Sequence, residues 1–188
     1  MSKVLRQRAM EDGLTHLYHA GAFKGLVERK LAKMKDGQLG AFWIMDLDNF
    51  KEFNDQYGHQ TGDEILRQFA HLLERSLRGD GIMARIGGDE FAAYLDVVEN
   101  QEEILALCGR IRDGAHSIKV EDKYVTISIG AVSVHPQDQY EILYRLADGA
   151  LYEAKRKQKD QYCIAEQQGQ RGSTTPKAYG AGAHSDLT

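Results

Sequence analysis

Residues 81–95 read GIMARIGGDEFAAYL, and the glycines in the middle of this stretch decide how the chain around them folds. Two glycines between apolar segments are typical of a β-hairpin, so we predict strands over 82–86 and 90–97 joined through Gly87 and Gly88. The acids Asp89 and Glu90 follow the glycines directly. Acids are also common in turns without any chemical role, so this stretch alone predicts a hairpin and leaves the purpose of its acids open.

The rest of the chain predicts helices that alternate with strands. A continuous apolar run that ends in acids, GAFWIMDLD at 40–48, predicts a strand buried on both faces. This order of elements is typical of an α+β domain in which helices flank a central, mostly antiparallel, five-stranded sheet. Helical spacing of apolar residues predicts helices over 3–12, 20–34, 63–78, 101–115 and 140–157, with a short helix between 49 and 62; further strands are expected over 118–120, 124–134 and, at an edge, 162–165.

Length and composition indicate one domain. The 188 residues are 42% hydrophobic, enough for a core. We expect residues 1–12 to be an N-terminal helix or linker from an upstream region, 13–166 to be the domain, and the Gly- and Ser-rich residues 167–188 to be a flexible tail. The sequence lacks a secretory signal and a membrane-spanning run, so we expect a cytoplasmic location, and the net charge of −4 argues against a nucleic-acid partner.

Acidic residues stand at the ends of two predicted strands. Asp46 and Asp48 close the buried strand, and Asp89 and Glu90 lie at the turn where the second strand of the hairpin begins. If these strands are neighbours, Asp46 and Asp89 can converge on one cation. Mg²⁺ prefers a few carboxylates together with substrate phosphates, an arrangement that suits nucleotidyl transfer. The hairpin glycines would fit such a site, because they accept a positive φ and let phosphates approach the backbone.

Other chemistries are excluded or left open. Phe50 and Lys51 occupy positions where a calcium loop needs Asp or Asn and then Gly, and the sequence has no phosphate-binding loop of the Walker type. His16 and His19 lack matching metal ligands and are interpreted as surface residues. 

Three polar residues have both a structural and a functional interpretation. Asp63 can cap a helix or, with Asn54, recognise guanine. Lys155 and Lys159 close the last helix, where cations are expected from the helix dipole alone or for binding phosphate.

Four segments taken together resemble the GGDEF family of diguanylate cyclases. They read DLDNFKEFNDQYGHQTGDEILRQFA, MARIGGDEF, VTISIGAV and LADGALYEAK, and the similarity extends from about Asp12 to about Ala165. The family condenses two GTP molecules into cyclic di-GMP and releases two pyrophosphates. The resemblance implies a fold like that of nucleotidyl cyclases and polymerase palm domains, a catalytic homodimer with the site at its interface, and an upstream sensory or receiver domain.

The resemblance also implies roles for the acids. Asp46 and Asp89 would ligate Mg²⁺, for which Mn²⁺ is a possible substitute, with help from the Leu47 carbonyl. Asp89 would in addition help deprotonate the attacking 3′-hydroxyl, and Glu90 would support the metal site.

For the substrate, the resemblance implies that Asn54 and Asp63 read guanine beside His59. Lys51 would stabilise charge on the triphosphate. The remaining implied substrate contacts are backbone amides near Asn49 and Phe50, the glycines Gly87 and Gly88, and the amines of Lys155 and Lys159 on the β- and γ-phosphates.

The chain departs from the family pattern at several positions. His16 replaces a glycine, and after the last helix Gln158 replaces a glycine and Asp160 an asparagine. The inhibitory product site matches at Arg78, but Gly81 stands where it needs Asp, so we predict weak or absent product inhibition. Because every acid of the site is kept, we favour an active cyclase; the alternative is a non-catalytic regulatory module that binds GTP or cyclic di-GMP.

Overall fold

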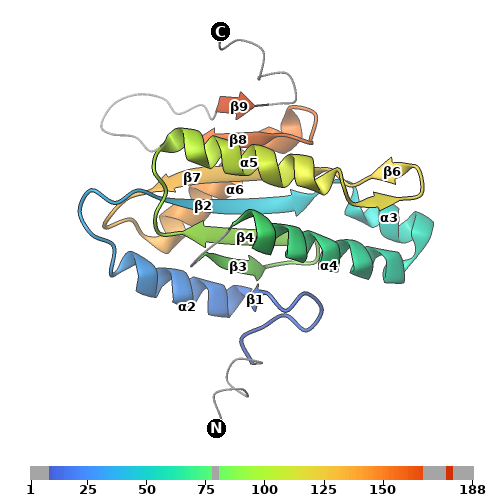
Figure 1. Cartoon of the computed structure of the whole chain (residues 1–188), viewed down its shortest axis with the longest axis horizontal. Coiled ribbons are helices and arrows are strands. Elements are labelled where there is room, and N and C mark those ends of the chain that lie inside the picture. Colours follow the sequence, from blue (N-terminus) through green and yellow to red (C-terminus); the bar gives the residue numbers. More distant parts are fainter. Residues whose placement is uncertain (1–8, 78–80, 167–176, 180–188) are drawn as a thin grey trace.

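The computed structural model describes residues 9–77 and 81–166, and the backbone of 177–179. In this part of the chain a mixed sheet lies between two layers of helices (Figure 1). The helices are α2 (Ala20–Leu31), α3 (Phe50–Tyr57), α4 (His59–Ser76), α5 (Gln101–Ala115) and α6 (Tyr140–Arg156). The strands are β1 (Tyr18–His19), β2 (Gly40–Leu47), β3 (Ile82–Arg85), β4 (Glu90–Leu95), β5 (Lys119–Val120), β6 (Lys123–Tyr124), β7 (Ile127–Val134), β8 (Tyr162–Ala165) and β9 (Lys177–Tyr179).

The main sheet has the strand order β1-β3-β4-β2-β7-β8-β9. Its pairings are antiparallel except for β1 with β3 and β7 with β8, so the predicted mostly antiparallel character is confirmed. The predicted number of five strands is wrong, because the described residues form seven. The outermost strands, β1 and β9, have only two and three residues, too few to leave a periodic pattern in the sequence.

Strand β2 divides the core into two halves because its side chains alternate between the faces of the sheet. Trp43 and Met45 pack in a cluster with residues of α4 and α5. Phe42 and Ile44 pack on the other face with residues of α2 and α6. All four side chains are fully buried, so the predicted strand with two buried faces is confirmed.

Two predicted helix boundaries differ from the structure. Gly58, with φ 86° and ψ 160°, lies between α3 and α4, so α4 begins at His59 rather than at Asp63. Asp63 therefore lies inside the helix, and its interpretation as an N-cap is wrong. At the N-terminus, residues 9–12 form a turn and a bridge from Glu11 to Tyr18 instead of the end of a helix, and residues 1–8 lie outside the described part.

Two predictions for the C-terminal half also need correction. The strand predicted over 124–134 is two strands: β6 pairs with β5 in a separate two-stranded sheet, and β7 begins at Ile127. Strand β8 is not an edge, because β9 from the predicted tail pairs with it. The rest of that tail lies outside the described residues. None of the helices in the described ranges is long and apolar enough to cross a membrane.

Candidate active site

The acids of the two predicted strand ends meet at one edge of the structure. Asp46 and Glu90 lie directly opposite each other in the antiparallel pair β2–β4, so their side chains share a face of the sheet. The Leu47 amide donates a hydrogen bond to the Asp89 carbonyl at 3.1 Å. This bond holds Asp89, the turn residue before Glu90, beside the end of β2. The predicted proximity of these strand ends is confirmed.

The Asp46 carboxylate is the electrostatic centre of this edge. Its side chain is 13% exposed, and burial together with the charges of Asp89 and Glu90 raises its pKa to about 6, although Lys155 opposes the shift. The Lys155 amine, from the last turn of α6, lies 2.9 Å from Asp46 Oδ2. The amine predicted to hold phosphate is thus a counter-ion of the acidic cluster in this structure.

The glycine turn is held in a way that the sequence does not show. Neither Gly87 nor Gly88 has a φ in the left-handed region, so the turn does not use the positive φ that glycine would accept. Instead, a Cβ on Gly87 would lie 2.6 Å from Glu90 Oε2, whereas Gly88 faces open space. Arg85 donates to the Gly88 carbonyl from Nε at 3.1 Å and Nη2 at 2.8 Å, and also contacts Asp12. The hairpin is confirmed, with an Arg side chain as its brace.

The predicted guanine-reading residues lie on two helices that pack together. Asn54 of α3 and Asp63 of α4 are both half-buried, whereas His59, at the start of α4, is exposed. The backbone of Gly62 approaches Asn54 so closely that a Cβ there would lie 1.9 Å from Oδ1. This Oδ1 is buried and has no hydrogen-bond partner among the residues that the structure describes. An unpaired buried acceptor is unfavourable and is suited to a ligand donor.

The start of α3 collects the residues predicted for the triphosphate. Asn49 is the N-cap and adopts the left-handed conformation with φ 54°, and its side chain makes no cap hydrogen bond. It accepts a hydrogen bond at 2.5 Å from the Lys159 amine instead. Phe50 is half-buried and Lys51 is exposed in the first turn, where helical N–H groups have no intrahelical partner.

Asp48 is a central residue that the sequence reasoning did not select. It is 3% exposed, and its carboxylate accepts hydrogen bonds from Thr126 Oγ1 at 2.9 Å, Ser128 Oγ at 2.7 Å and the Asp160 amide at 2.9 Å. It therefore joins the end of β2 to β7 and to the segment that follows α6. Its position two residues after Asp46 is the sequence feature that could have pointed to it. Once a calcium loop was excluded, no role was assigned to Asp48.

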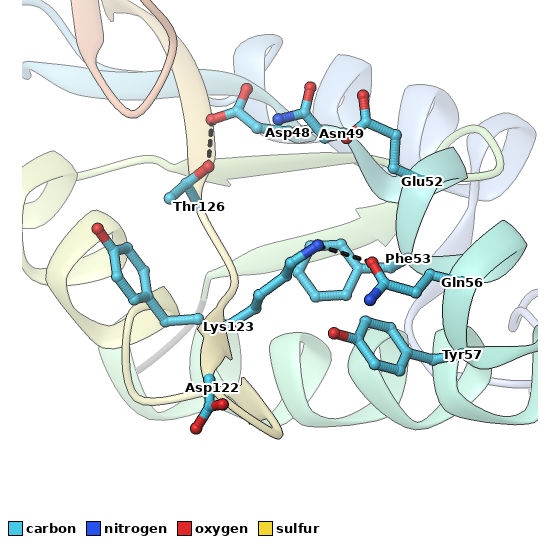
Figure 2. Close-up of a pocket in the computed structure, with 10 residues that line it drawn as sticks. Asp48, Asn49, Glu52, Phe53, Gln56, Tyr57, Asp122, Lys123 and Thr126 are labelled. Atoms are coloured by element: carbon cyan, nitrogen blue, oxygen red, sulfur yellow. Dashed lines mark hydrogen bonds between the residues drawn. The ribbon is translucent and has the colours of Figure 1, made fainter.

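A cavity of about 350 Å³ lies beside this network, between α3 and the β5–β6 hairpin (Figure 2). Figure 2 shows Asp48 and Asn49 at one end and Tyr57 and Asp122 at the other, with Lys123 reaching across to Gln56. Among the predicted site residues, all of which are described, Asn49 alone lines it. Asp48 also lines the cavity, whereas Asp46, Asp89 and Glu90 do not.

The donor set at those ends fits a hard divalent cation. Among the described residues no group of three or more His, Cys, Asp or Glu side chains is arranged to hold a metal by itself. Burial first, and then the charges of Asp89 and Glu90, oppose the ionisation of Asp46 and raise its pKa. A bound cation would favour the ionised form, and Mg²⁺ takes its other ligands from phosphate and water.

The two histidines near the N-terminus have no part in this site. His16 is exposed and has φ 61°. His19 caps α2, since its Nδ1 accepts from the Ala22 amide at 3.2 Å while Nε2 lies 3.1 Å from the Ala9 carbonyl. The interpretation of both as surface residues is confirmed, with a structural role for His19.

Comparison with known proteins agrees with this geometry. Residues 9–161 match the family model described as "Diguanylate cyclase, GGDEF domain". Over 169 residues the chain is 35% identical to diguanylate cyclase DgcS of Shewanella oneidensis, covering 87% of this chain and 55% of that protein. It is 34% identical to the probable diguanylate cyclase DgcT of Escherichia coli, covering 81% of this chain and 35% of the relative.

A solved structure shares the fold. The coiled coil and GGDEF domain of DgcB from Caulobacter crescentus, in complex with c-di-GMP, superposes with a TM-score of 0.77 at 30% identity, covering 84% of this chain and 86% of that one. The chain belongs to the GGDEF family of diguanylate cyclases. It spans about a third to a half of the length of the curated relatives it matches.

Proposed function

We propose that this chain is an active diguanylate cyclase domain that condenses two GTP molecules into cyclic di-GMP. The observation that carries the proposal is the meeting of Asp46, Asp89 and Glu90 at one sheet edge, within a domain of this family. Burial, together with the charges of Asp89 and Glu90, raises the pKa of Asp46, so the ionised carboxylate is unfavourable for folding. A carboxylate in such an environment is typical of sites where the charge is used in chemistry.

The metal would be held by the acids of the strand ends. The Asp46 and Asp89 carboxylates and the Leu47 carbonyl would be its protein ligands, with Glu90 in support. When bound, Mg²⁺ supplies Lewis-acid polarisation of the α-phosphate, and Mn²⁺ is a possible substitute. In the free protein the Lys155 amine compensates Asp46, so this amine becomes available to phosphate oxygens once another cation neutralises the acid.

The protein side chains then bind and orient the substrate. Asn54 and Asp63, with His59 beside them, would recognise the guanine edge, and the orphaned Asn54 Oδ1 supports this assignment. Lys51 and the start of α3 would face the triphosphate, with Lys155 and Lys159 on its outer phosphates. 

The chemical step needs a base and a leaving group. Asp89 would take the proton of the 3′-hydroxyl as its oxygen bonds to the α-phosphorus, and the bond to pyrophosphate breaks. Because each domain would hold one GTP, two domains must face each other, so the catalytic unit is a homodimer.

The preference of the protein for GTP over ATP tests this function. We expect pyrophosphate release from GTP and almost none from ATP, and we expect Asn54→Ala to lower kcat/KM for GTP about a hundredfold because a buried polar contact is lost. Asp55→Ala, an exposed neighbour on the same helix, is the matched control and should leave turnover unchanged. Equal turnover of ATP would contradict the proposal. GTP binding without pyrophosphate release would instead indicate the regulatory module.

A further inference from the structure

The segment that follows α6 has an unusual backbone. Gln158, Lys159 and Asp160 have φ values of 96°, 59° and 49°, three consecutive residues other than glycine in the left-handed region. Residues with side chains avoid this region and persist there only when their surroundings hold them. The middle residue of this left-handed segment carries an amine predicted to bind phosphate.

The left-handed segment is held from one side by the buried Asp48. The Asp160 amide donates to Asp48 Oδ2 at 2.9 Å, and Thr126 and Ser128 satisfy the rest of that carboxylate. This contact holds the backbone of Asp160, and the Asp160 side chain has a partner of its own.

That partner is His116, the residue that caps the C-terminal end of α5. Its Nε2 lies 2.7 Å from Asp160 Oδ1, and because a carboxylate only accepts, the imidazole donates. The two side chains are 33% and 29% exposed. The ring of His116 also packs against that of Tyr124 at a centroid distance of 5.0 Å, which limits its movement.

The left-handed segment determines where the Lys159 amine lies. This amine donates to Asn49 Oδ1 at the start of α3, although the two residues are 110 positions apart in the chain. We propose that His116 is a positioning residue for this amine: by holding the Asp160 carboxylate, it keeps residues 158–160 left-handed and delivers Lys159 to the start of α3. The effect on GTP rests on the proposed function, in which Lys159 binds its phosphates.

Enzyme kinetics of three variants test the proposal in the whole chain. His116→Ala should raise KM for GTP about tenfold, the order of magnitude for a lost hydrogen bond to a charged group, with kcat within about twofold. His116→Gln, whose amide can still donate to Asp160, should reverse most of this rise in KM. His71→Ala is the matched control, because His71 pairs with Glu74 on the exposed face of α4 at 3.2 Å.

Amide hydrogen exchange of the nucleotide-free protein provides a readout that needs no turnover. In His116→Ala the amides of Lys159 and Asp160 should exchange at least about tenfold faster, while those of β2 and β7 keep their protection and show that the fold is intact. If that variant fails to fold, His116→Asn, too short to reach Asp160, takes its place with the same expectation.

The outcomes separate this proposal from the proposed function. Unchanged exchange at Lys159 and Asp160 in a folded variant would overturn the positioning role whether or not the protein turns over GTP. An unchanged KM in an active enzyme would overturn it as well. A wild-type protein without turnover, in which exchange responds as expected, would contradict the cyclase function and leave the positioning role supported.

Discussion

At the scale of single residues, Asp46 shows how a residue proposed to bind metal acts against stability. Its pKa of about 6 in the fold lies above its ordinary value of 3.8, so the folded state binds the proton more tightly than the unfolded chain. Ionised Asp46 therefore destabilises the fold above pH 6, by up to about 3 kcal/mol. This cost fades as the pH falls through 6 and is absent below 3.8, where both states are protonated.

We predict that Asp46→Asn stabilises the protein at pH 8 in the absence of divalent metal. The amide resembles the neutral acid, so the free energy of unfolding should rise by about 1–3 kcal/mol at pH 8 and by almost nothing at pH 3.5. Urea denaturation at several pH values measures the difference. Asp148→Asn, at an exposed position on α6, is the control and should show no such trend. A loss of stability in Asp46→Asn at pH 8 would contradict the account.

The β3–β4 hairpin shows what a residue pattern can and cannot indicate. The GGDEF sequence predicted the turn, and the apolar run before Asp46 predicted the strand beside it. The contact of Asp160 with Asp48 spans 112 residues and involves one backbone amide, so no local pattern contains it. The ion pair of Lys155 with Asp46 could not be predicted from the sequence either. A lysine in the last turn of a helix gives the same sequence pattern whether it faces solvent, an acid or phosphate.

At the scale of elements, α5, α6 and the short strand β8 were predicted well, whereas the strands β1 and β9 were missed and α4 was predicted to start too late. Helix α5 has the predicted bounds, and α6 ends one residue before its predicted end. Strands β1 and β9 are formed by tertiary pairing of two or three residues, which leaves no period to detect. The early start of α4 depends on Gly58, whose positive φ allows two helices to follow each other with a single residue between them.

The packing of α6 on β7 gives a sharp prediction. A Cβ on Gly130 of β7 would lie 2.0 Å from the Ala147 carbonyl and 2.3 Å from the Leu151 amide, so backbone would have to move. Gly130→Ala should therefore lower the free energy of unfolding by about 3 kcal/mol, measured by urea denaturation. Because α6 carries Lys155, turnover should fall as well.

Gly149 provides the matched control in the same helix. A Cβ there meets open space, and alanine favours a helix, so Gly149→Ala should stabilise the protein by up to about 1 kcal/mol. If Gly130→Ala unfolds within about 0.5 kcal/mol of the wild type, α6 does not pack on β7 as closely as described.

At the scale of the whole molecule, the proposed reaction requires two copies of the chain. Specific activity should rise with protein concentration while the domain is mostly monomeric and level off once it is dimeric, because dimer formation follows mass action. Initial rates from nanomolar to micromolar protein, with light scattering to report the mass, measure this. A constant specific activity from particles of monomer mass would contradict the homodimer.

The proposed reaction joins two GTP molecules with the acids of the strand ends as catalysts. Its decisive test is chromatography of the nucleotides formed from GTP and Mg²⁺ by the wild type and by Asp89→Asn, after both are shown to be folded. The wild type should form cyclic di-GMP with two pyrophosphates per product, and Asp89→Asn should form no product above background. Tight GTP binding without cyclic di-GMP at any protein concentration, or undiminished synthesis by Asp89→Asn, would contradict it.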